Sequence, residues 1–430
     1  MTGNVASTPH LRRIGSFVTL GAIVAILFET LLPESGHPFG SHLCLVCGEL
    51  GGVDSLLNVL LFVPLGVGLA LRGINWNRSI LMACAVSVAV ETSQLLFVPG
   101  RDATLGDVVT NTVGAALGFA LARHAGSWLR PPPRLAAMLG LAWCLLWLGV
   151  QAASNFSFTP SIPDSTDFGQ IARELGDFDV FPGRVIRASI GDVAVLDAQL
   201  DAHDSIASRL LGGATVSATV MPGGLTTGIA PIVRVADAGQ REIVLLGQQE
   251  SRFVFGVRTG AAILRLRPPL FALPGVFPAS TAAPDTLVLN GRYLPREVTM
   301  GAQTGLEIRR TAIAPTAALG WTLVLPGQWL IEDTRAERAM SLAWLALLVL
   351  PLGYWAAWVS GAGARQPEKF RRIVFLAWTL YLAVLAAGLG LVPLAFGLPP
   401  ARLDELLAVL VGVLLGAALP RLVGRGSGNG

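Results

Sequence analysis

Acid and amide side chains recur inside three apolar segments between residues 52 and 123, where each such group needs a partner or a function. The residues that could do chemistry there are Asp54, Asn58, Glu91, Gln94, Arg101, Asp107 and Asn111. Carboxylates and amides could accept or donate hydrogen bonds to a polar head group, and the arginine could meet a phosphate or a carboxylate. In a structural alternative, which stays open, the same groups bridge neighbouring helices.

Helical spacing places these side chains on common faces. Glu91 and Gln94 are three residues apart, and Asp107 and Asn111 are four apart, so each pair shares one face of a helix. If the three segments cross a membrane in alternate directions, the helix rise puts the polar groups roughly 4 to 10 Å below one surface. The spacing therefore predicts one ligand-binding cluster in the outer leaflet.

The composition is that of a polytopic membrane protein. Of the 430 residues, 53% are hydrophobic and only 14% are charged, which excludes an ordinary soluble protein. The net charge is only +3 and there are no long Lys/Arg runs, so we expect no nucleic-acid partner. About eight transmembrane helices are predicted, at residues 14–32, 55–71, 80–97, 105–122, 135–152, 339–359, 373–394 and 403–419.

The arginines indicate an orientation. They concentrate in alternate loops, whereas the intervening short loops are nearly bare of positive charge, and residues 33–53 contain none. Because positive loops stay in the cytoplasm, both termini are predicted to be cytoplasmic in the cell (inner, cytoplasmic) membrane. The segment between the fifth and sixth helices then lies outside the cytoplasm.

That segment, residues 154–335, has a different pattern. Its short apolar runs alternate with polar residues, and turn residues recur every eight to twelve positions or so, which is typical of an antiparallel β-sandwich. Asp237 to Gln240 is predicted to be a hairpin turn. On strand pattern the segment resembles jelly-roll sandwiches of the concanavalin-like or laminin-G-like kind, which implies binding of an envelope polysaccharide or a protein. The predicted domains are residues 1–153 (five helices), 154–335 (sandwich) and 336–430 (three helices).

Two groups of residues could hold a metal ion. The first comprises His37, His42, Cys44 and Cys47 in the first outer loop, where a disulfide, free thiols and a zinc site all stay open. The second comprises Asp192, Asp197, Asp201 and Asp204, which could offer oxygen ligands to calcium but lack EF-hand spacing. We expect solvated loop acids there, and no cofactor in the protein.

The polar segments carry a family resemblance. The ordered motifs are Asp54, LLNVLLFVPLG ending at Gly66, VETSQ ending at Gln94, Arg101, DVVTNTVG over residues 107–114, and Gly118. In these motifs, residues 20–123 resemble the VanZ-like family, named after an accessory factor in low-level teicoplanin resistance. The resemblance implies a membrane domain with a role in the cell envelope, and it supplies no catalytic mechanism.

The last predicted helix contains a partial repeat of these motifs. Glu405, Gly412 and Gly416 repeat the spacing of Asp107, Gly114 and Gly118. A decayed internal repeat would explain why helices follow the sandwich. Chance similarity between glycine-rich helices is the alternative.

Three classes of function remain open. The favoured class is a non-enzymatic protein that recognises a membrane lipid or a lipid-linked glycan through the polar cluster. The second is a membrane enzyme that acts on a lipid-linked substrate, with Glu91 or Asp107 as the acid or base. The third is a transporter, against which the apolar inner halves of the helices count.

Overall fold

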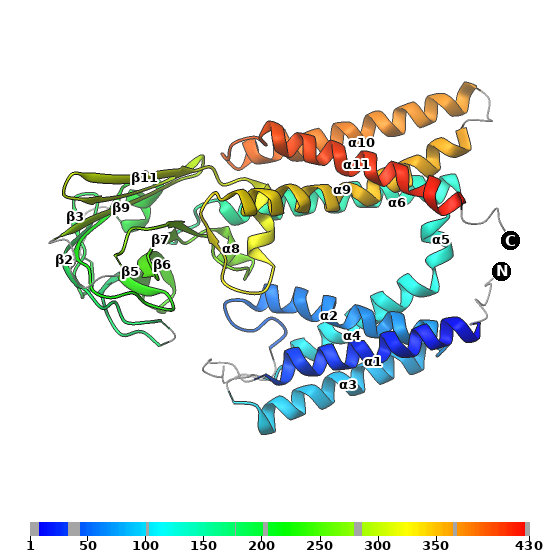
Figure 1. The fold of residues 1–430 in the computed structure, drawn as a ribbon, viewed down its shortest axis with the longest axis horizontal. Helices are drawn as coiled ribbons and strands as arrows, with labels where there is room; N and C mark the ends of the chain where they lie inside the picture. The colour runs from blue at the N-terminus through cyan, green and yellow to red at the C-terminus, as the bar shows by residue number, and fades with distance from the viewer. Residues whose placement is uncertain are drawn as a thin grey trace. The chain divides into compact units, whose positions relative to one another are not determined.

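The computed structural model describes residues 8–32, 44–99, 103–176, 178–200, 205–278, 286–363 and 368–425. Its backbone contacts divide the chain into two compact units, Met1–Ala137 and Met138–Gly430, and each is described by itself. Figure 1 shows the elements of both units. Arg101, His37, His42, Asp201 and Asp204 lie outside the described residues.

Eight helices of the described chain are long and apolar enough to cross a membrane. They are α1 (Pro9–Leu31), α2 (Gly51–Leu71), α3 (Trp76–Phe97), α4 (Leu105–Arg123), α6 (Pro133–Phe158), α9 (Arg335–Gly363), α10 (Glu368–Ala395) and α11 (Leu403–Arg425). The short helix α5 (Ala125–Leu129) follows α4. The prediction of a multi-pass helical membrane protein is confirmed, whereas the side on which each loop lies stays a prediction.

Polar caps define where the helices of the first unit begin. The side chains of Thr8, Asn75 and Thr104 accept hydrogen bonds from backbone N–H groups in the first turns of α1, α3 and α4. Each cap satisfies one of the donors that a helix leaves without an intrahelical partner. The start of α4 is thus fixed at the residue that precedes the predicted polar cluster.

Glycines bring α2 and α4 into backbone contact. A Cβ atom added at Gly114 or Gly118 of α4 would collide with the carbonyl oxygen of Val59 or Val63 on α2. One added at Gly66 of α2 would collide in turn with α4. Small residues permit such close approach in membrane helices, and the two helices run side by side in Figure 1. This contact fixes the polar side chains of α2 at a short distance from those of α4.

The second unit repeats this packing between α9 and α11. A Cβ atom at Gly412 or Gly416 of α11 would collide with the carbonyl oxygen of Ala346 or Leu350 on α9. Gly353 of α9 makes the reciprocal approach to α11. The sequence pattern Leu-x-x-Pro-Leu-Gly ends at Gly66 in α2 and at Gly353 in α9. The two helix pairs share both the spacing and the contacts of their glycines.

The rest of the second unit is a β-sandwich with two six-stranded sheets. One sheet has the order β1 (Asp167–Ile171), β5 (Ala230–Asp237), β6 (Glu242–Gln249), β7 (Arg252–Val257), β8 (Leu270–Leu273) and β12 (Leu330–Ile331). The other has the order β11 (Glu307–Ile313), β10 (Glu297–Thr304), β9 (Leu287–Leu294), β4 (Val216–Met221), β2 (Arg184–Ile190) and β3 (Val193–Ala194). All pairs are antiparallel except β12 with β8. The short helices α7 (Ile206–Leu211), α8 (Gly260–Ile263) and η1 (Ala317–Leu323) complete the segment.

The burial of the strands follows their place in the sandwich. Strand β5 is buried at every position, whereas β9 alternates between buried and accessible residues, so one face of its sheet is open. The hairpin predicted at Asp237 is confirmed, because it joins β5 to β6 with a hydrogen bond from Gln240 N to Asp237 O of 2.9 Å.

The sandwich also contacts helix α6. Tyr293 on β9 donates to the carbonyl oxygen of Phe158 at the end of α6 (2.8 Å), and burial raises the pKa of Tyr293.

Candidate functional site

The first unit brings most of the predicted site residues to facing helices. Asn58 lies on α2, Glu91 and Gln94 on α3, and Asp107 and Asn111 on α4. Asp54 also lies on α2, in its first turn, and is exposed. Because α2 and α4 touch through their backbones, polar side chains on their facing sides lie within reach of each other.

A hydrogen-bond network joins three of these helices. Asn58 Nδ2 donates to Asp107 Oδ1 across α2 and α4 (2.6 Å). The hydroxyl of Thr104 donates to Asp107 Oδ2 (2.7 Å) and accepts from the backbone N–H of Asp107 (3.1 Å). The backbone N–H of Thr104 donates to Glu91 Oε2 on α3 (3.0 Å). Thr104 therefore connects the two carboxylates.

Two further contacts extend the polar layer. Asn111 Nδ2 donates to Ser87 Oγ on α3 (2.9 Å), and Gln94 Nε2 donates to the carbonyl oxygen of Thr30 on α1 (3.0 Å). The side chain of Asn111 is only 2% exposed, yet its Oδ1 atom finds no hydrogen-bond donor among the described residues. A buried amide oxygen without a donor costs roughly 1–3 kcal/mol, so this atom is suited to receive a hydroxyl or a water.

Burial differs within the network. Glu91, Gln94 and Thr104 are buried, whereas Asn58 and Asp107 are half-buried. In an apolar surrounding a carboxylate interacts strongly with any donor that reaches it. The half-buried Asp107 is therefore the acid that a ligand could reach most directly.

A disulfide loop covers the first turn of α4. Cys44 and Cys47 form a disulfide with a Cα–Cα distance of 5.7 Å, so their sulfurs are not thiolate ligands for zinc. The backbone N–H of Gly106 donates to the carbonyl oxygen of Cys44 (3.1 Å), and a Cβ atom at Gly106 would collide with the carbonyl of Leu45. The loop thus packs against the turn that carries Asp107.

Two of the four acids that could offer ligands to calcium, Asp192 and Asp197, lie among the described residues, and both pair with arginines. Asp192 pairs with Arg209, and Asp197 lies 3.7 Å from Arg173. Within the described ranges, no three His, Cys, Asp or Glu side chains gather closely enough to hold a metal ion.

Sequence reasoning missed Thr104 and Ser87. Thr104 stands three residues before Asp107, which is the spacing of a capping box, and that signal could have identified it. Ser87 precedes Glu91 by four residues, so it shares the face of α3 that carries the acid.

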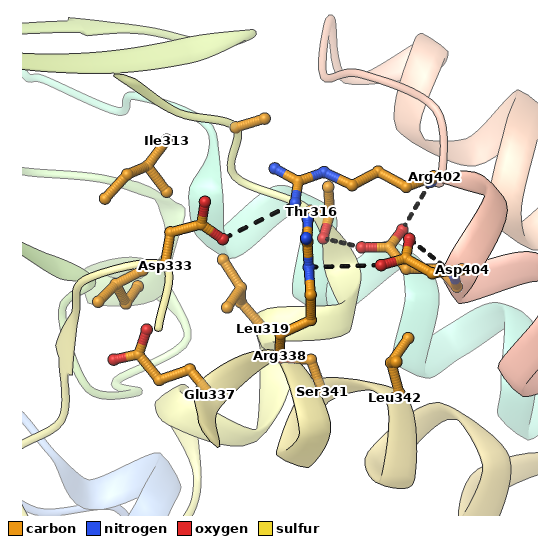
Figure 2. A pocket seen from close by; sticks show the side chains of 13 residues that line it. Ile313, Thr316, Leu319, Asp333, Glu337, Arg338, Ser341, Leu342, Arg402 and Asp404 are labelled. Carbon is orange, nitrogen blue, oxygen red and sulfur yellow. Dashed lines mark hydrogen bonds and ion pairs between the residues drawn. The ribbon is translucent and has the colours of Figure 1, made fainter. Parts of the chain in front are cut away.

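A second polar cluster lies where the sandwich meets α9 and α11 (Figure 2). Buried Glu405, in the first turn of α11, accepts from the hydroxyl of Thr316 (2.8 Å) and from the backbone N–H of Arg402 (2.9 Å). Arg402 lies 3.8 Å from Asp333, and Arg338 of α9 lies 3.3 Å from Asp404. The free volume of about 30 Å³ would hold about two water molecules, which is too small for a lipid head group.

Comparison with known proteins identifies the N-terminal region. Residues 3–129 match the family model described as VanZ/LLP1, and this range contains α1 to α5 and the whole polar network. The N-terminal helical region is therefore VanZ-like, as its motifs predict. No curated protein and no solved structure matches the chain.

Proposed function

We propose that this VanZ-like membrane protein is a non-enzymatic receptor for the head group of a membrane lipid or a lipid-linked glycan of the cell envelope. The site would lie at the outer leaflet of the cytoplasmic membrane and would consist of Asn58, Glu91, Thr104 and Asp107. The observation that carries the proposal is the network itself, which holds two carboxylates close together at one end of three apolar helices.

The chemistry of the network favours a head group rich in hydroxyl or amine donors. Carboxylates only accept hydrogen bonds when ionised, and the unpaired Oδ1 atom of Asn111 is a further acceptor at the same bundle. Arg101 lies outside the described residues, but it stands three residues before Thr104 in the sequence and would supply the positive charge that a phosphate requires. A glycosylated lipid phosphate has both kinds of group.

The arrangement also favours binding over catalysis. Glu91 accepts from a backbone N–H and Asp107 from an amide and a hydroxyl, so both carboxylates already hold the helices in position. A general acid or base needs a carboxylate that exchanges its proton with substrate. Their hydrogen-bond partners given above are a threonine and an amide, which position a ligand without exchanging protons with it.

The test is lipid-resolved native mass spectrometry of the purified protein in membrane lipid extract, with thermal melting of each variant. Glu91→Gln and Asp107→Asn should lose a lipid that the wild type retains. Their melting temperature should be unchanged, because the amide oxygen of each variant can still accept the bond from Thr104 N–H or Asn58. Thr92→Val is the matched control, because Thr92 is exposed beside Glu91 and its hydroxyl bonds within α3. Equal lipid retention by all proteins, with a lowered melting temperature for the two acid variants, would show that the network only packs helices and would overturn the proposal.

A further inference from the structure

The open face of the sheet β11-β10-β9-β4-β2-β3 has its own polar surface. The inward residues of these strands, such as Leu289 and Met300, belong to the sandwich core, so the alternate residues point away from it. Strand pairing sets the outward residues in rows that run across the sheet. The central row consists of Arg310, Gly301, Asn290, Ser217 and Ser189.

The neighbouring rows add two arginines and further polar side chains, together with three apolar ones. On one side lie Ala312, Thr299 and Arg292, and on the other Ile308, Gln303, Val288, Thr219 and Arg187. These three rows contain three arginines, hydroxyl and amide side chains, and neither a carboxylate nor an aromatic ring. The surface thus carries a net positive charge.

A groove of about 610 Å³ lies on this face, with Gly301 in its floor. Arg310, Arg292, Asn290, Thr299 and Thr215 line it. The central row crosses five strands, so it is about 19 Å long at the usual strand spacing. That length suits a short linear chain of several units.

The side chains in the groove have unused hydrogen-bonding capacity. Ser217 Oγ donates to Asn290 Oδ1 (2.7 Å), which leaves the N–H groups of the Asn290 amide without an acceptor among the described residues. Arg292 uses its Nε atom to hold the carbonyl of Gly213 (2.7 Å), which fixes the guanidinium at the edge of the groove. Exposed Arg310 has no carboxylate partner in the described part of the chain.

We propose that this face binds a linear acidic polysaccharide. Arginine recognises carboxylates and phosphates through paired N–H groups, while Ser, Thr and Asn can both donate to and accept from sugar hydroxyls. Single-stranded nucleic acid is disfavoured, because its binding sites stack bases on aromatic rings and these rows have none. This site belongs to the sandwich, so it stands whether or not the helical bundle binds a lipid.

The test measures binding of oligogalacturonate to the full-length protein in lipid nanodiscs, with an uncharged oligogalactan beside it. Arg310→Ala should weaken the binding of oligogalacturonate about tenfold, because one charged contact is lost. Gly301→Val should abolish it by filling the floor. The fold tolerates a Cβ atom there, since its nearest neighbours would be Arg310 Cγ at 3.7 Å and the carbonyl oxygen of Arg309 at 3.8 Å.

Arg309→Ala is the matched control. Arg309 precedes Arg310 on β11, points to the opposite face and pairs with Glu307 (2.9 Å), so its loss should leave binding unchanged. Equal weakening by Arg309→Ala and Arg310→Ala would show an unspecific charge effect and overturn the proposal. Equal affinity for the uncharged oligogalactan would overturn it too. Tighter binding of polyglutamate than of oligogalacturonate would assign the groove to an acidic protein instead.

Discussion

The helix pairs α2/α4 and α9/α11 share one backbone packing but give their acids different partners. Asp107 and Glu405 both stand in the first turn of the second helix, seven residues before the first of two packing glycines. Asp107 accepts from Asn58 of the facing helix, whereas the position equivalent to Asn58 is the buried Leu345 in α9. Glu405 accepts instead from Thr316, which follows the last long strand of the sandwich.

In each pair the glycines set the packing of the two helices, and the acid decides what else the pair binds. Glycine packing is common to both pairs, so it sets the distance between helices whatever the polar groups do. The acid accepts hydrogen bonds from whichever element lies next to the first turn of its helix. In α11 it is buried and fastens the sandwich, and in α4 it is half-buried beneath the disulfide loop.

The largest expected effect comes from breaking the shared packing. Gly118→Ala and Gly416→Ala each place a Cβ atom on a carbonyl oxygen of the facing helix. We expect each to lower the free energy of unfolding by about 3 kcal/mol, because tightly packed backbones must separate. The measurement is chemical unfolding of the purified protein in detergent.

Gly21→Ala and Gly390→Ala are the controls, because an added Cβ atom has no neighbour within 4 Å at either position. Each should leave stability unchanged or raise it slightly, since alanine favours a helix. A large loss for Gly118→Ala beside none for Gly416→Ala would contradict the equivalence of the two pairs.

Double-mutant cycles probe the difference between the acids. Thr316→Ala and Glu405→Ala should show a coupling energy of about 2 kcal/mol, because their hydrogen bond is buried and charge-assisted. Asn58→Ala and Asp107→Ala should couple by about 1 kcal/mol, since that pair is only half-buried. Unfolding free energies of the single and double variants give both values. Stronger coupling between Asn58 and Asp107 than between Thr316 and Glu405 would mean that Asp107 is the structural acid and would reverse the assignment.

The sequence predicted the helices and the polar cluster well because both rest on local patterns. Apolar length and helical spacing identified eight spans and placed Asn58, Glu91 and Asp107 together. The bonds from Thr104 to Glu91 and from Thr316 to Glu405 join separate segments of the chain, which periodicity does not encode. The three carboxylate-free rows on the sandwich likewise emerge only from strand register, because together they draw their residues from five strands.

The smallest effect is expected at Asp179, an acid that is accessible to water. Like Glu91 and Glu405, Asp179 in the sandwich accepts from backbone N–H groups, those of Gly228 (2.6 Å) and Thr227 (3.0 Å). The bond from Gly228, followed by that from the Thr227 hydroxyl, holds the pKa of Asp179 below its ordinary value of 3.8. The ionised form therefore stabilises this loop fully above the ordinary pKa, and that stabilisation is lost as the pH falls through the lowered one.

Amide hydrogen exchange at Thr227 and Gly228 reports this loss directly. In the wild type, protection of the two amides should fall as the solution is acidified below the ordinary pKa of an aspartate, and in Asp179→Asn it should not depend on pH in that range. Asp197→Asn is the control, because Asp197 pairs with the exposed Arg173 and touches neither amide. Since the contact is open to water, its removal should alter the loop alone and leave the unfolding of the sandwich unchanged. Global unfolding at the same pH would mean that an acid more open to water than Glu405 can hold the fold in the same way. Burial would then not explain the difference between the two acids.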